Sequence, residues 1–192
     1  RTAAGPDRGL AAVSCAAAAT DWWFMGASAV SGRRDLLVLS NPLSVKATLN
    51  ITAWTPTGPL TPAAGQAVQL QPGVRVALSL AGLFSAQAAL AVHVSATEGK
   101  VTAAIRDAES VTIRGATVPR GFDWIPAVPA PATVVVIPGV PSGASIERTL
   151  SVLAPAGGGT ATVEVLGKDG AYRPVALPSV PLPAGRVAVL DV

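Results

Sequence analysis

Apolar and polar residues alternate one by one along several short segments of the chain. In residues 47–53, Leu49 and Ile51 fall on one side of an extended backbone, and Thr48 and Asn50 fall on the other. Successive side chains of an extended chain point to opposite faces, so this period of two predicts a half-buried β-strand. The same pattern returns in residues 74–80 and 90–94, and residues 101–106 are expected to form a further strand.

Turn-forming residues separate these segments. The chain has 19 Gly and 17 Pro among 192 residues, with turn signals at residues 41–42, 56–58, 71–73 and 98–100. The last signal predicts a β-hairpin between residues 90–95 and 101–106, and residues 80–89 are expected to supply one helical turn. Short strands joined by frequent turns predict an all-β fold of tandem antiparallel β-sandwich modules of the immunoglobulin-like kind.

The chain contains an internal repeat. Residues 20–26 align with residues 133–139, and residues 37–42 align with residues 150–155, both at an offset of 113 residues. Further along, the offset becomes 112 after small changes in loop length. Because order, spacing and apolar phase all agree, we interpret the chain as two copies of one module.

The repeat predicts the domain layout. Residues 1–19 are a lead-in segment, residues 20–115 the first β-sandwich repeat, residues 116–132 a Pro-rich linker and residues 133–192 a truncated second repeat. Counterparts of the last two strands of the first repeat would fall beyond residue 192. We therefore expect that the chain belongs to a longer protein, or that another segment fills the open strand edge. Trp124 in the linker is expected to act as a wedge between the modules.

Composition limits the chemistry that the sequence supports. Half of the residues are hydrophobic and 13% are charged, which predicts a folded core, and no apolar stretch approaches the length of a membrane span. The net charge of +3 is scattered, so no nucleic-acid partner is predicted. The single His93 and the single Cys15 offer no ligand spacing for a metal, and we predict no catalytic residue, no cofactor and no enzyme activity. A pair among the 11 acidic residues is the remaining enzymatic alternative.

Two single residues each allow more than one interpretation. Cys15 has no partner for an internal disulfide, so it is a small structural residue or half of a bridge to another segment, with lipidation as the alternative. His93 lies on the polar face of its strand, and we favour a surface histidine over a general base.

Tryptophans are the candidate ligand-contacting residues. Trp22 shares one strand face with Phe24 while Trp23 lies on the other face, and Trp54 ends its strand beside a turn. We favour core packing, because the repeat counterparts of the first strand are all apolar. The alternative is stacking against sugar rings, for which the candidates are Trp22, Trp23, Trp54 and Trp124.

Two blocks near the start of the chain resemble a known family. Residues 9–15 (Gly-Leu-Ala-Ala-Val-Ser-Cys) and 20–28 (Thr-Asp-Trp-Trp-Phe-Met-Gly-Ala-Ser) are similar to an actinobacterial secreted or membrane-anchored family of unknown function. The resemblance continues through residues 37–42, 121–126 and 134–138. It implies an extracytoplasmic β-rich region with a membrane anchor or signal outside this chain, encoded near cell-envelope glycosyltransferases. It brings no catalytic residues.

These observations predict a non-enzymatic extracytoplasmic scaffold or interaction module of the cell envelope. The alternative is a glycan-binding accessory protein for cell-wall polysaccharide assembly. The expected partner is an envelope protein or a surface glycopolymer, and the sequence leaves the oligomeric state open.

Overall fold

The protein is almost entirely built from β-strands. The computed structural model describes residues 10–140, 146, 148–175 and 179–191. Within these ranges the helical elements are α1 (Leu80–Phe84) and a single 3-10 turn (Ala63–Gly65). The predicted all-β class is therefore confirmed, and so is the one helical turn expected within residues 80–89.

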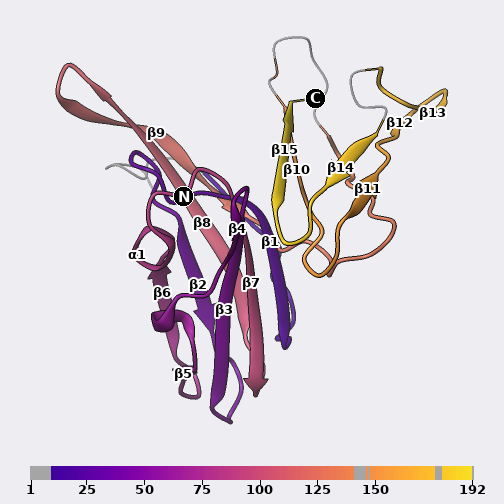
Figure 1. Ribbon diagram of the computed structural model, residues 1–192. Coiled ribbons are helices and arrows are strands. Elements are labelled where there is room, and N and C mark those ends of the chain that lie inside the picture. The colour runs from indigo at the N-terminus through magenta and orange to yellow at the C-terminus, as the bar shows by residue number, and fades with distance from the viewer. Residues whose placement is uncertain (1–9, 141–145, 147, 176–178, 192) are drawn as a thin grey trace.

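The first repeat is a sandwich of two antiparallel sheets (Figure 1). One sheet has the order β1 (Asp21–Ala27), β7 (Leu90–Glu98), β3 (Ala47–Thr55) and β4 (Gly58–Leu60), with β5 (Val68–Leu70) also paired to β3. The other sheet has the order β6 (Arg75–Ser79), β2 (Leu36–Ser40), β8 (Thr102–Ile113) and β9 (Ala116–Ile125).

The core lies between these two sheets. In β3, every second residue from Ala47 to Thr55 is buried and the residues between them are half-buried, as the alternating sequence predicts. In the facing sheet, β2 alternates between half-buried and buried residues in the same way. The largest side chains with less than 2% exposure include Phe24, Leu37, Leu39, Leu49, Ile51, Val92, Val94 and Ile105. Burying one such side chain stabilises the fold by about 1.5–3 kcal/mol.

The turn at residues 98–100 joins two different sheets. The sequence predicts a hairpin there, and this prediction is wrong, because both edges of β7 are already occupied by β1 and β3. The chain instead crosses the sandwich to β8. Gly99 has a left-handed φ of +72°, and Val101 anchors the crossing by exchanging two backbone hydrogen bonds with Ala19 at 2.9 and 3.0 Å.

The segment expected to be a linker begins as a strand. Residues 116–132 are Pro-rich, but residues 116–125 form β9, which pairs antiparallel with β8. Trp124 is half-buried and lies opposite Arg106 in this sheet, so it belongs to a strand of the first repeat. After β9 the chain returns to the other sheet, where the Val128 N–H donates to the Trp23 carbonyl at 2.8 Å.

The second repeat reproduces three strand pairings of the first. β10 (Thr149–Leu153) pairs with β15 (Val187–Asp191), β11 (Gly159–Ala161) pairs with β14 (Val180–Leu182), and β12 (Val165–Gly167) pairs with β13 (Gly170–Tyr172). The corresponding pairs in the first repeat are β2 with β6, β3 with β5 and β3 with β4.

Register is also repeated in the first of these pairs. Leu37 lies opposite Leu78 in the first repeat, and Leu150 lies opposite Leu190 in the second. The turn before the second strand is repeated too, because the Gly73 N–H donates to the Asn41 carbonyl and the Gly185 N–H donates to the Ala154 carbonyl, both at 2.8 Å. The two copies of the sequence repeat therefore share these strand pairings.

The expected first strand of the second repeat does not form. Residues 133–137 align with β1, but they carry no strand, and Val134 and Val136 are 79% and 65% exposed. In the first repeat, β1 is held by β7. No strand of the described second repeat stands at the place of β7, so residues 133–137 lack the pairing that holds β1.

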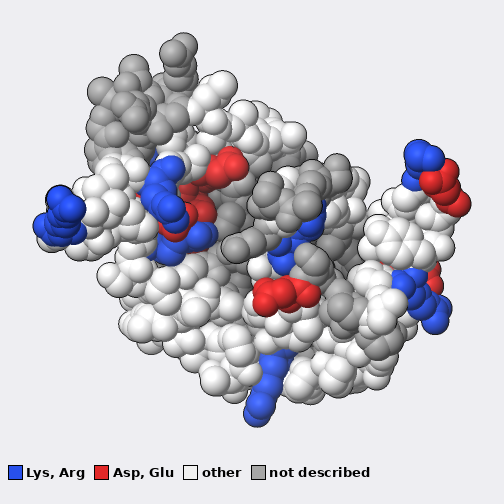
Figure 2. Space-filling model, turned by 90° about the horizontal axis from the view of Figure 1, so that it is seen from above, with Lys and Arg blue, Asp and Glu red and all other residues white. Residues whose placement is uncertain are grey.

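No helix within the described ranges has the length and apolar character needed to cross a membrane. Charged side chains of both signs are interspersed on the face of the molecule seen in Figure 2.

Candidate functional site

The outer face of the β1–β7–β3 sheet carries aromatic and hydrogen-bonding side chains in register; we call it the aromatic face. Antiparallel pairing arranges its residues in three rows, which run Asp21–Ser95–Asn50, Trp23–His93–Thr52 and Ala91–Trp54. Neighbouring strands lie about 5 Å apart and alternate residues about 7 Å apart, so these side chains are immediate neighbours.

Strand alternation decides which tryptophans reach this face. Trp22 points into the sandwich, where it is 7% exposed and its indole N–H donates to the Val101 carbonyl at 3.0 Å. Its ring therefore belongs to the core and is closed to a ligand. Trp23 and Trp54 are half-buried on the aromatic face, whereas Trp124 lies in the other sheet.

Three rings of the aromatic face pack together. The His93 imidazole stacks on Trp23 with ring centroids 4.0 Å apart and planes inclined by 17°. Trp54 stacks on Trp23 at 5.3 Å and 24°, and it is tilted relative to His93 at 6.2 Å and 41°. Offset stacking of this kind stabilises aromatic pairs beyond their buried area.

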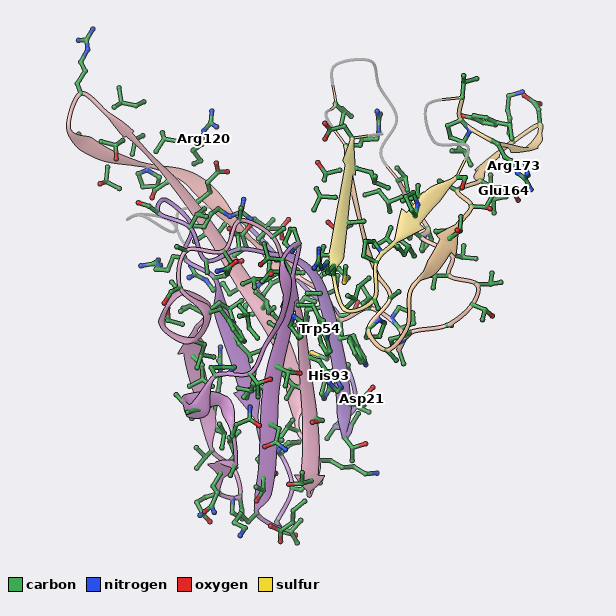
Figure 3. The ribbon with its side chains drawn as sticks, in the orientation of Figure 1. Asp21, Trp54, His93, Arg120, Glu164 and Arg173 are labelled. Carbon is green, nitrogen blue, oxygen red and sulfur yellow. The ribbon has the colours of Figure 1, made fainter. Side chains whose placement is uncertain are left out.

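Asp21 fixes the orientation of two of these rings. Its Oδ1 atom lies 2.5 Å from His93 Nε2, and its Oδ2 atom accepts a hydrogen bond from the Trp23 indole N–H at 2.9 Å. Figure 3 shows Asp21, His93 and Trp54 on the side of the first repeat that lies below the second. The Asp21 side chain is 48% exposed and the His93 side chain 18% exposed, so solutes can reach this pair.

The second repeat borders one end of the aromatic face. A Cβ atom placed on Gly185 would lie 3.8 Å from Trp54 Cδ1 and 3.9 Å from Pro59. Gly185 has a φ of +64° and forms the turn before β15. The turn of the second repeat therefore stands against the Trp54 end, and the Asp21 row lies at the other end.

A second polar cluster, centred on a buried carboxylate, lies in the first repeat. The Asp35 side chain is fully buried, and its Oδ2 atom accepts a hydrogen bond from the Ser28 N–H at 2.8 Å. Arg33 Nη2 lies 2.6 Å from Asp107 Oδ2. Burial and, after it, the nearby Asp107 raise the pKa of Asp35 to about 7, and the Ser28 N–H and Arg33 oppose this shift. Because Asp35 cannot contact a solute, we assign it a structural role.

Metal binding and thiol chemistry are the other candidates for a site in the described residues. There, no group of three or more His, Cys, Asp or Glu side chains is placed to hold a metal ion. Cys15 is a free, exposed thiol. The aromatic face is therefore the arrangement with the clearest capacity for ligand contact, through stacking and hydrogen bonding.

Comparison with known proteins identifies the family. Residues 1–192 match the model of a family of unknown function (DUF5719). The chain belongs to this family. No curated protein matches it. Among solved structures, the crystal structure of Thermotoga maritima 1070 is similar over 57% of this chain and 93% of that chain, with 13% identity and a TM-score of 0.44.

The expected resemblance to a family of unknown function is thus confirmed as membership of DUF5719. The actinobacterial origin, the secretion and the gene setting stay predictions. In this DUF5719 chain, sequence reasoning named Trp23 and Trp54 but did not single out Asp21. A signal for Asp21 was present, because it lies two residues before Trp23 and therefore on the same strand face.

Proposed function

We propose that the chain is a non-enzymatic interaction module of the extracytoplasmic cell envelope, whose second repeat accepts further strands at its open edges, from another part of the polypeptide or from a partner. The observation that carries the proposal is the open strand edges of the second repeat. An open edge presents unpaired N–H and C=O groups, which are a template for adding a strand.

The two repeats differ in how many neighbours their strands have. β2 lies between β6 and β8, whereas its counterpart β10 pairs only with β15 in the described part of the chain. β3 has β7 on one side and β4 and β5 on the other. Its counterparts β11 and β12 have only β14 and β13 among the described strands. The edges left open are those that β8 and β7 occupy in the first repeat.

Apolar side chains at these open edges are incompletely buried. Leu37 and Ala53 are 0% exposed in the first repeat. Their counterparts in the strand pairing, Leu150 and Val165, are half-buried and 38% exposed respectively. Nearby Tyr172 is 59% exposed. Added strands would remove this surface from water, and such burial is the dominant favourable term in protein association.

The first repeat indicates what the added segment is like. β7 and β8 contribute Val92, Val94 and Ile105 to the core, all at 0% exposure. A partner segment therefore needs two strands with apolar residues at alternate positions, joined by a short turn that crosses the sandwich. The extracytoplasmic setting is supported by the resemblance of residues 9–15 and 20–28 to a secreted family.

A peptide with the sequence of residues 90–106 tests the proposal, because it contains β7, the crossing turn and the start of β8. We expect saturable binding to the protein, measured by isothermal titration calorimetry. Leu150→Asp should weaken binding more than tenfold, because the strand addition would bury an unpaired charge.

Ser151→Asp is the matched control. Ser151 is the neighbour of Leu150 in β10 and lies on the opposite strand face, so its substitution should change the affinity less than twofold. Circular dichroism checks that both variants keep their strands. Absence of binding, or an equal loss in both variants, would contradict the proposal.

Glycan binding is the second candidate function. It is supported by the aromatic face, where Trp23, His93 and Trp54 lie beside hydrogen-bonding side chains.

A further inference from the structure

We infer that the aromatic face is a binding site for a neutral saccharide. This inference rests on the second candidate function and adds to it the residues and the chemical class of ligand. It uses a surface that is separate from the strand edges of the second repeat.

The aromatic face joins apolar rings to free hydrogen-bonding groups. Trp23 and Trp54 keep part of their surface exposed, and the His93 stack and the Asp21 hydrogen bond restrict the motion of Trp23. A sugar ring has an apolar face of C–H groups and a rim of hydroxyls. A fixed indole therefore offers contact area for the apolar face at a low entropic cost.

The polar groups beside the rings match a hydroxyl rim. Asn50 uses its Oδ1 atom to accept from the Ala67 N–H, which leaves its amide N–H groups for a ligand. Within the described part of the chain, the hydroxyls of Ser95 and Thr52 make no hydrogen bond. The partly exposed Asp21 carboxylate adds acceptor capacity. Donors and acceptors thus lie together, as a polyol needs.

Charge on this face selects a neutral ligand. Asp21 is the ionisable acid in the three rows, and the rows contain no Lys or Arg. Lys46 lies further along the sheet and is paired with Glu98 at 3.3 Å. A uronic acid or a phosphorylated glycan would place its negative charge near Asp21, and His93, the basic residue of the rows, is already in contact with that carboxylate. Neutral hexose or pentose polymers carry no such penalty.

The two ends of the aromatic face limit how a saccharide lies on it. The Gly185 turn of the second repeat borders the Trp54 end, and the Asp21–Ser95–Asn50 row stands at the other end. The rings would therefore contact the sugar near the second repeat, and the polar row would contact hydroxyls further out.

Titration with soluble polysaccharides tests the inference on the full chain. The probes are a neutral β-glucan, a mannan and a galactan, with polygalacturonate as the anionic comparison, and the readouts are calorimetry and tryptophan fluorescence. We expect at least one neutral polymer to bind saturably and polygalacturonate not to bind. Trp23→Ala should weaken binding about tenfold, which is the upper range for one aromatic contact. Trp124→Ala, in the other sheet, should leave it unchanged.

A milder pair of variants keeps the test decisive if Trp23→Ala does not fold. Ser95→Ala removes one hydroxyl from the aromatic face and should weaken binding several-fold. Ser40→Ala removes a hydroxyl from a half-buried strand position in the other sheet and should have no effect. Binding that is equal in Ser95→Ala and Ser40→Ala, binding of polygalacturonate as strong as that of the neutral polymers, or no binding at all would overturn the inference. Leu150→Asp should leave saccharide binding intact, which separates this result from the strand-addition test.

Discussion

At the residue scale, adjacent side chains of β1 have different roles because they point to different faces. Trp22 packs in the core, where its indole N–H donates to the Val101 carbonyl. Trp23, the next residue, lies on the aromatic face. The Asp21 carboxylate then uses one oxygen for His93 and the other for Trp23. A single acid therefore orders the two stacked rings.

Asp35 makes the stability of the fold depend on pH. Its pKa is about 7 in the folded protein against an ordinary value of 3.8, mainly because burial disfavours the charged carboxylate. The folded state therefore binds this proton more tightly than the unfolded state. The stabilising contribution is fully present below about pH 4, and it is lost as the pH rises through about 7.

We predict that Asp35→Asn removes this dependence. The Asn oxygen can still accept from the Ser28 N–H, and the variant carries no buried charge. Between pH 5 and pH 8 the wild type should lose about 1–3 kcal/mol of unfolding free energy relative to the variant. Urea denaturation at both pH values measures the difference. A difference that is the same at pH 5 and pH 8 would rule the explanation out.

At the element scale, the crossing turn between β7 and β8 decides how the first repeat closes. Gly99 has a φ of +72°, and a Cβ atom there would lie 2.7 Å from the Lys46 carbonyl oxygen and 3.0 Å from Ala47. These contacts are with backbone and with a buried strand residue, so they cannot easily move. The turn thus requires Gly both for its conformation and for its space.

Gly99→Ala should therefore destabilise the protein more than Gly73→Ala. Gly73 has the same φ of +72°, but no atom lies within 4 Å of the place that an alanine methyl would take, so its variant reports the backbone strain alone. We expect Gly99→Ala to cost about 1–3 kcal/mol more than Gly73→Ala in urea denaturation. Equal losses would show that crowding at Lys46 and Ala47 does not matter.

Local sequence patterns predict strands better than they predict strand partners. The alternation of apolar and polar residues predicts β3 and β7, and the repeat offset of 113 residues aligns β2 with β10. The same patterns could not tell that residues 98–100 cross between sheets, because a tight turn looks alike in both cases. Nor could they bring Asp21 to His93, which is 72 residues away and becomes its neighbour only when β1 pairs with β7.

At the scale of the whole molecule, the two repeats differ in how completely they are buried. The core of the first repeat contains many side chains at 0% exposure, whereas Val180 and Val187, both 5% exposed, are the buried hydrophobic residues of the described second repeat. Segments with few buried contacts open at a lower free energy than the core of a domain.

Hydrogen exchange should therefore separate the repeats. We predict slow amide exchange in β2, β3 and β7 and exchange faster by at least tenfold in β10, β11 and β15, followed by mass spectrometry of peptic peptides. Saturation with the peptide of residues 90–106 should slow exchange in β10 and leave β3 unchanged. Uniform protection along the chain in the absence of peptide would contradict this.

Trp54 belongs to the aromatic face and also lies beside the Gly185 turn of the second repeat. A sugar held against Trp54 would lie beside this turn, and the turn leads into β15, the strand that pairs with β10. Thermodynamic linkage is reciprocal, so if a glycan alters the affinity for a partner strand, the strand must alter the affinity for the glycan by the same factor. One indole at the junction of the repeats would then couple recognition of a polymer to recognition of a protein.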